Sequence, residues 1–228
     1  MERADFRCPN KTCLCAWHRG RSPADVWIGQ VLRLFLPGWG STAEVWAPFA
    51  QPGDRLGGEI EAGAEIVAWS LGAMQALEAA TRMELGSLTL VGASGQFVRQ
   101  GKYRQGWPER SLLRMRERLS EDAGAVFDEF WALALASGEE VPAPPREENA
   151  AMLKLGLAYL AEYSMLERAP NISCPVRLLH GGRDRVCPLA AAELLAEALP
   201  HAELTVWPEA GHAPFLTQPD RFRSWLLS

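Results

Sequence analysis

The chain has 228 residues and a formal net charge of −5, and 48% of its residues are hydrophobic while 22% are charged. These proportions are those of a globular protein with a sizeable core, so they exclude a disordered, coiled-coil or collagen-like chain. No apolar run approaches the roughly 20 residues of a membrane-spanning helix. A chain with a negative net charge binds nucleic acid poorly unless its basic residues are clustered. We therefore expect neither a membrane nor a nucleic acid as a partner.

The cysteines indicate the redox environment. Their positions are irregular: Cys8, Cys13, Cys15, Cys174 and Cys187. An odd and irregular set argues against a disulfide framework, and the N-terminal segment lacks the apolar stretch of a secretory signal, so we expect a reduced, cytoplasmic protein. The first three cysteines and His18 match no standard zinc spacing, so we predict no metal, with a metal site there as the alternative.

Strand-like and helix-like segments alternate along most of the chain. Apolar runs bounded by Gly or Pro predict buried strands, and good helix formers with apolar positions at helical spacing predict helices. In chain order we predict strands at 31–36 and 65–69, a helix after residue 72, strands at 87–92 and 175–182, a helix at 190–199, a strand at 202–207 and a terminal helix from about 214 to 227. This alternation predicts an α/β fold with a mainly parallel sheet.

Residues 97–168 interrupt this alternation. They are charged, helical in pattern and broken by several prolines. We predict that they form an inserted helical cap over the carboxyl ends of the strands, where open α/β sheets place their sites. Residues 1–96 and 169–228 would then form the core domain.

A short motif, AWSLG at 68–72, lies between a predicted strand and a predicted helix. A serine flanked at two residues on either side by small residues, in this context, is typical of a nucleophile elbow, a turn so sharp that the hydroxyl projects from the sheet. Serine at its ordinary pKa is a weak nucleophile and needs a base, which in turn needs an orienting acid. We therefore predict that Ser70 is a nucleophile.

The base and the acid are expected later in the chain. Asp184 follows the predicted strand at 175–182, and His212 follows the predicted strand at 202–207. The order Ser, Asp, His is that of nucleophile-elbow enzymes, so we predict His212 as base and Asp184 as orienting acid. The alternatives are a turn-stabilising role for Asp184 and, for the strand residue His180, the role of an ordinary core histidine.

An ester-cleaving serine also needs two backbone N–H groups that face the developing oxyanion. We predict that these come from Leu71, directly after the nucleophile, and from Trp39, in the turn PGWG after the first strand. Because glycines let the backbone approach a ligand closely, this turn is suited to the role. Trp39, Trp69 and Phe97 are further predicted to contact the substrate.

With these motifs the chain resembles the α/β-hydrolase superfamily and, within it, the pimeloyl-[acyl-carrier protein] methyl ester esterases of biotin synthesis. The resemblance rests on GWG at 38–40 with AEVW at 43–46, on WSLG at 69–72, and on HAPF at 212–215 followed by QP at 218–219. It implies an α/β-hydrolase fold, a Ser70–Asp184–His212 triad and no metal or organic cofactor. The segment between Trp46 and Trp69 is short for the strand, helix and strand that the resemblance implies there.

Charge is uneven along the predicted cap. Residues 99–118 carry a formal charge of +5 and residues 119–150 a charge of −7. On a helix Arg110, Arg114 and Arg118 share one face, and a basic patch attracts acidic partners. Acyl-carrier proteins are strongly acidic, so we predict these arginines as a partner-binding surface. The alternative is a solvated helix face that pairs with the neighbouring acidic segment.

These observations favour a monomeric serine carboxylesterase that hydrolyses a methyl ester linked to an acyl-carrier protein. One alternative is a general short-chain carboxylesterase or thioesterase with the same triad. The other is a hydrolase-like binding protein without turnover, against which the complete Ser, Asp and His set argues.

Overall fold

A computed structural model describes residues 33–136 and 138–228. Its strands form one sheet in the order β2-β1-β3-β4-β5-β6, in which every neighbouring pair is parallel. The strands are β1 (Arg33–Leu36), β2 (Arg55–Leu56), β3 (Glu65–Trp69), β4 (Ser87–Val91), β5 (Val176–Gly181) and β6 (Ala202–Trp207). The predicted parallel sheet is confirmed.

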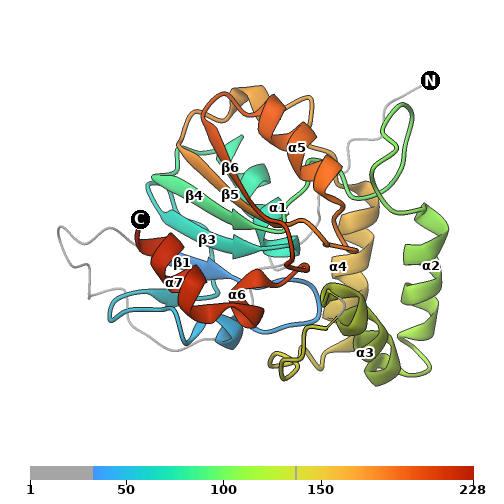
Figure 1. Ribbon diagram of the computed structural model, residues 1–228. Helices are drawn as coiled ribbons and strands as arrows, with labels where there is room; N and C mark the ends of the chain where they lie inside the picture. The colour runs from blue at the N-terminus through green and yellow to red at the C-terminus, as the bar shows by residue number, and fades with distance from the viewer. Residues whose placement is uncertain (1–32, 137) are drawn as a thin grey trace.

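The central strands are largely apolar because both of their faces are covered. In β3 and β4 every residue after the first is buried. Helices flank the sheet (Figure 1), namely α1 (Leu71–Ala80), α5 (Leu189–Ala198), α6 (Pro214–Thr217) and α7 (Pro219–Leu227), with short 3₁₀ turns η1 (Ala43–Trp46) and η2 (Ala169–Asn171). The strands place their carboxyl ends at one edge, which is where the loops that carry the predicted site residues begin.

The prediction of one terminal helix from about 214 to 227 is wrong. The segment forms two helices, α6 and α7, with Gln218 between them in a non-helical conformation at φ −134° and ψ 60°. Pro219 is the cause, because proline disfavours a helical conformation in the residue before it. The break turns Phe215 and Phe222 toward the same partner, Trp46, whose indole stacks on Phe215 with ring centroids 4.3 Å apart.

The short segment between Trp46 and Trp69 lacks the helix that the family resemblance implies there. Within residues 47–64 the structure contains the two-residue strand β2 and no helix. The chain therefore returns to β3 through turns, and β2 is the edge of the sheet beside β1.

Three longer helices lie within residues 97–168, at the end of the sheet to which the strands point (Figure 1). They are α2 (Glu109–Arg118), α3 (Ala123–Ala134) and α4 (Ala150–Glu162). Side chains of Asp122 and Asn149 accept hydrogen bonds from the first free N–H groups of α3 and α4, which fixes where both helices begin. The position is that predicted for the cap, whereas the division into two domains stays a prediction.

Two of the five cysteines lie within the described residues. Cys174 and Cys187 are buried free thiols, while Cys8, Cys13, Cys15 and His18 lie outside the described residues. Within the described part of the chain no cluster of three metal-ligating side chains occurs. None of the described helices combines the length and the apolarity that crossing a bilayer requires.

Candidate active site

The turn between β3 and α1 holds Ser70 in a strained backbone conformation. Its φ is 52° and its ψ −114°, and no other non-glycine residue in the described ranges has a positive φ. Such strain costs of order 1–3 kcal/mol and persists where the surrounding structure enforces it. Here the N–H of Ser70 donates to Val91 and that of Gly72 to Pro37. A Cβ on Gly72 would lie 2.5 Å from the Pro37 carbonyl oxygen, so this position requires glycine.

The structure brings Ser70, His212 and Asp184 together from three loops at the carboxyl edge of the sheet. The Oγ of Ser70 lies 2.8 Å from Nε2 of His212. The Nδ1 of the same ring lies 2.6 Å from Oδ2 of Asp184. All three residues are buried, with His212 fully so. The result is a continuous hydrogen-bonded chain from hydroxyl to carboxylate in a site shielded from water, where such contacts are stronger than in solvent.

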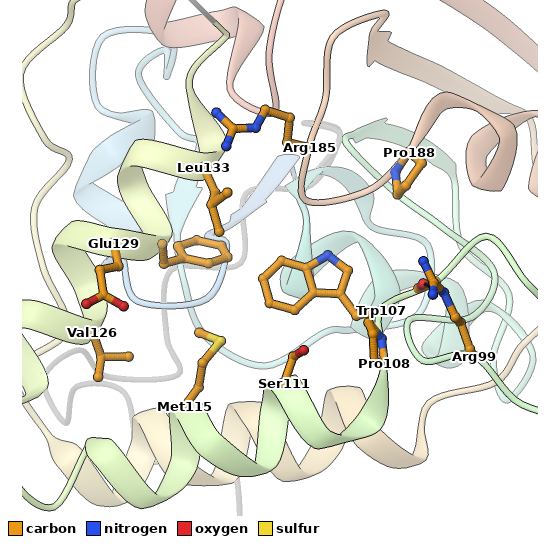
Figure 2. A pocket seen from close by; sticks show the side chains of 12 residues that line it. Arg99, Trp107, Pro108, Ser111, Met115, Val126, Glu129, Leu133, Arg185 and Pro188 are labelled. Atoms are coloured by element: carbon orange, nitrogen blue, oxygen red, sulfur yellow. Dashed lines mark hydrogen bonds between the residues drawn. The ribbon is translucent and has the colours of Figure 1, made fainter.

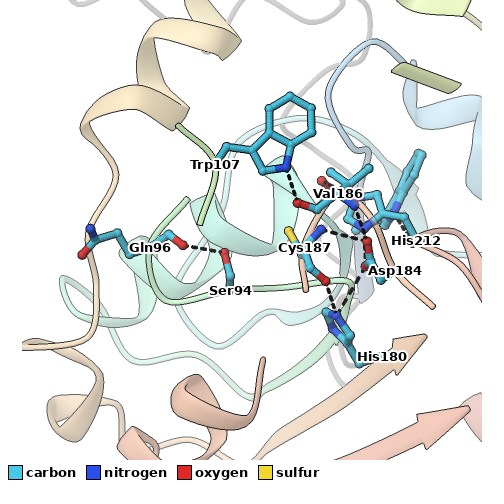
Figure 3. Close-up of polar contacts among 10 residues, drawn as sticks. Ser94, Gln96, Trp107, His180, Asp184, Val186, Cys187 and His212 are labelled. Atoms are coloured by element: carbon cyan, nitrogen blue, oxygen red, sulfur yellow. Dashed lines mark hydrogen bonds and ion pairs between the residues drawn. The ribbon is translucent and has the colours of Figure 1, made fainter. Parts of the chain in front are cut away.

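Asp184 also fills the turn-stabilising role considered as its alternative. While Oδ2 faces His212, Oδ1 accepts hydrogen bonds from the N–H groups of Val186 and Cys187, each 2.8 Å long (Figure 3). The two roles are compatible because a carboxylate has two oxygens with separate lone pairs. The loop after β5 is thus held by the same side chain that contacts the imidazole of His212.

A second histidine, His180, faces the same carboxylate, a contact that the sequence did not reveal. Its Nε2 is 2.7 Å from the Cys187 carbonyl and 3.4 Å from Oδ2 of Asp184 (Figure 3). Since a carbonyl oxygen only accepts, Nε2 carries the proton. Burial lowers the pKa of His180 despite the nearby carboxylate, so the ring is neutral. His180 is a buried core histidine, as its alternative interpretation predicts, and within the core it contacts the Asp184 carboxylate.

His212 is held by its backbone as well as by its ring. Its N–H donates to the carbonyl of Ala134 at the end of α3, and its carbonyl accepts from the indole of Trp69. A Cβ on Gly92 would lie 2.8 Å from the imidazole, so only glycine leaves room for the ring. The structure therefore places Trp69 in contact with His212, whose backbone it supports. Its contact with substrate stays a prediction.

The loop that carries Trp39, a predicted oxyanion donor, packs against the turn between β3 and α1, where the N–H of Gly72 donates to the carbonyl of Pro37. Neither the N–H of Trp39 nor that of Leu71 donates to an acceptor within residues 33–136 and 138–228. The Trp39 indole donates instead to the Leu153 carbonyl in α4, and its ring meets Phe130 edge-on at 4.9 Å between centroids. A Cβ on Gly156 would lie 2.7 Å from this indole, so glycine allows α4 to approach it.

A comparison with known protein families bears on this arrangement. The model of the alpha/beta hydrolase family matches residues 36–225, which include every element of the sheet except the first residues of β1. The chain belongs to this family. The expected α/β-hydrolase fold is therefore confirmed by both the topology and the family match.

Relatives and solved structures agree with this assignment. This α/β hydrolase is 32% identical over 201 residues to the pimeloyl-[acyl-carrier protein] methyl ester esterase of Aromatoleum aromaticum, covering 81% of this chain and 78% of that one. It is 30% identical to the protein of the same name from Nitrosomonas europaea, covering 75% and 71%. An esterase structure from Exiguobacterium antarcticum superposes with a TM-score of 0.75 over 87% of this chain and 91% of that one, at 17% identity, which shows the fold alone.

The three arginines predicted as a partner surface of this α/β hydrolase separate into two groups. Arg118 forms a bidentate ion pair with Glu129 of α3, with N–O distances of 2.5 and 2.7 Å. This pairing raises the pKa of Arg118 and lowers that of Glu129. Arg110 and Arg114 are exposed on α2 and form no ion pair with any described residue. The alternative of pairing with the acidic segment therefore holds for Arg118 alone.

The last predicted substrate contact, Phe97, is buried at the start of the segment predicted as the cap. Its ring is tilted against that of Trp107, with centroids 5.6 Å apart. Trp107 in turn donates its indole N–H to the Val186 carbonyl, two residues beyond Asp184. Phe97 thus lies on the side of the site that faces α2, whereas Trp39 lies on the side that faces α4.

Proposed function

We propose that this α/β hydrolase is a serine carboxylesterase that removes the methyl group from pimeloyl-[acyl-carrier protein] methyl ester, with Ser70, His212 and Asp184 as its catalytic triad. The observation that carries the proposal is the unbroken hydrogen-bonded chain from the Ser70 hydroxyl to the Asp184 carboxylate. The named activity of the Aromatoleum and Nitrosomonas relatives supports the choice of ester.

The first half of the mechanism is acylation. Nε2 of His212 accepts the Ser70 proton while Oγ attacks the ester carbonyl, so that a tetrahedral oxyanion forms. The N–H groups of Leu71 and Trp39 stabilise its charge, a contribution typically of about 3–4 kcal/mol per donor. The imidazolium then protonates the leaving alkoxide, and methanol departs.

The second half is deacylation by water. His212 removes a proton from the water, which attacks the acyl-Ser70 carbonyl, and then returns that proton to Oγ. Asp184 holds Nδ1–H in place during both halves, so that Nε2 is the nitrogen free to accept. No metal or organic cofactor takes part in these steps, and the reaction would run on a monomer in the cytoplasm.

The direct test uses the purified chain and a carrier protein loaded with the methyl ester. Mass spectrometry is expected to show the methyl ester converted to the free acid while the thioester to the carrier stays intact. Cleavage of the thioester would identify a thioesterase instead, and turnover of p-nitrophenyl butyrate alone would identify a general short-chain esterase. Binding without any turnover would indicate the non-catalytic alternative. Growth of a biotin auxotroph lacking this esterase, rescued by the chain, would place the activity in biotin synthesis.

The exposed arginines of α2 lead to a prediction about the carrier. Replacing Arg110 and Arg114 together by Glu is expected to raise KM for the carrier-linked ester about tenfold, because acidic side chains repel an acidic partner. Turnover of p-nitrophenyl butyrate is expected to stay unchanged.

The matched control is replacement of Arg221 and Arg223 together by Glu, which reverses the same number of exposed arginines on α7 and breaks ion pairs at the surface. Because an exposed pair contributes little to stability, this variant should fold normally. Equal loss of activity on both substrates after the Arg110 and Arg114 change would contradict a carrier-binding role for this face.

A further inference from the structure

A cavity of about 460 Å³ lies under the cap, beside the triad rather than at it. Figure 2 shows Ser111 and Met115 pointing into it from α2, with Trp107 at its centre and Arg185 on the side opposite α2. Its apolar walls are formed by Trp107, Pro108, Met115, Val126, Phe130, Leu133 and Pro188. A space of this size with largely apolar walls and a few polar groups is suited to a small organic ligand.

The ionisable side chains that line this cavity give it a positive balance. They are Arg99, Glu129 and Arg185. The charge of Glu129 is already compensated by its bidentate pair with Arg118. Arg99 uses one nitrogen, Nε, for the Gly106 carbonyl at 2.6 Å. Arg185 is exposed, and its guanidinium has no hydrogen-bond or ion-pair partner among the described residues, so it is available to a ligand.

The walls of the cavity contact two loops of the candidate active site. Arg185 directly follows Asp184, and Trp107 is bonded to Val186 in the same loop. On the other wall Phe130 packs against Trp39, the predicted oxyanion donor. These contacts place the cavity beside the loops that carry Asp184 and the predicted oxyanion donor.

We propose that this cavity is a subsite for an anionic group at the distal end of the acyl substrate, with Arg185 as its principal ligand and Arg99 as the second. The inference rests on the proposed function and adds the substrate class: an acyl ester whose far end bears an oxyanion. A guanidinium binds carboxylate and phosphate oxygens with paired N–H donors, and such charge-assisted bonds are stronger than neutral ones. In the proposed carrier-linked substrate the anion is the phosphate of the phosphopantetheine arm, whereas in a substrate without a carrier it is a carboxylate at the far end of the acyl chain.

Binding measurements in a Ser70→Ala background test the proposal without turnover. Two matched pairs separate the two sources of the anion: monomethyl heptanedioate against its neutral amide, and the monomethyl heptanedioyl thioester of phosphopantetheine against that of pantetheine. We expect the anionic member of at least one pair to bind about tenfold more tightly, with a preference that weakens as salt rises. The pair that shows the preference identifies the source.

Arg185→Gln in the same background is expected to abolish that preference while leaving the Kd of the neutral members unchanged. Arg183→Gln is the matched control, because Arg183 is an exposed arginine of the same loop that does not line the cavity. Equal affinities within both pairs, or an Arg185→Gln effect that is the same for anionic and neutral members, would overturn the inference.

These outcomes are distinct from a failure of the proposed function. If the otherwise unmodified chain with Ser70 hydrolyses none of the esters while the charge preference depends on Arg185, the subsite stands and the esterase proposal falls. If neutral esters are hydrolysed in a Ser70-dependent way without any charge preference, the esterase proposal stands and the subsite falls.

Discussion

Ser70→Ala is expected to lower kcat for ester hydrolysis by roughly 10⁶-fold, because removing the nucleophile of a triad costs about as much as removing the whole triad. Residual turnover would come from the backbone N–H groups and from substrate binding, which the substitution leaves in place. The measurement is kcat on p-nitrophenyl butyrate and on the carrier-linked ester, together with labelling by a fluorophosphonate probe, which is expected to disappear.

The control for this prediction is Ser224→Ala, since Ser224 is an exposed residue of α7 whose hydroxyl bonds within its own helix. This variant should keep wild-type turnover and labelling. If the Ser70→Ala protein were still labelled at an equal rate, the nucleophile would be another residue, and the proposed mechanism would be wrong.

Asp184→Asn is expected to lower kcat by about 10⁴-fold, which is the scale found when a triad acid is replaced by its amide. The Asn carbonyl oxygen can keep the hydrogen bonds from Val186 and Cys187, so its NH₂ group is directed at His212. The imidazole must then accept at Nδ1 and carry its proton on Nε2, where it can no longer take the proton of Ser70.

The opposite orientation of the amide is unfavourable, since it would leave the backbone N–H groups of Val186 and Cys187 facing an NH₂ group. Because the loop contacts survive in the favoured orientation, we expect the Tm of the variant to be close to that of wild type. Asp220→Asn is the control, as Asp220 pairs with Arg223 at the surface. A kcat within tenfold of wild type would show that Asp184 does not orient the base.

The predictable part of the site follows from short-range constraints. A buried parallel strand needs a continuous apolar run, and the sharp turn at Ser70 needs a glycine two residues later, where a Cβ would meet the Pro37 carbonyl. Both requirements can be recognised from the residue types within a few positions of the sequence. The order of Ser70, Asp184 and His212 along the chain added a further constraint, because parallel strands end at the same edge of the sheet.

Other features of the site depend on contacts between segments that are distant in the sequence, so local sequence patterns do not predict them. Arg118 is one of three arginines with the same helical spacing, but it alone has Glu129 of the next helix within reach. His180 reads as a core residue of a strand, and its contact with Asp184 arises from the path of the loop after β5.

The amino-acid sequence by itself determined the strand and helix alternation, the elbow at Ser70 and the identity of the three residues that meet there, because backbone sterics and burial act residue by residue. Only the tertiary structure decided that α3 binds the backbone of His212, that Trp69 supports it and that Arg185 faces a cavity without a protein partner. The physical reason is that these contacts join segments far apart in sequence, and their geometry exists only once the sheet and the helices above it have packed.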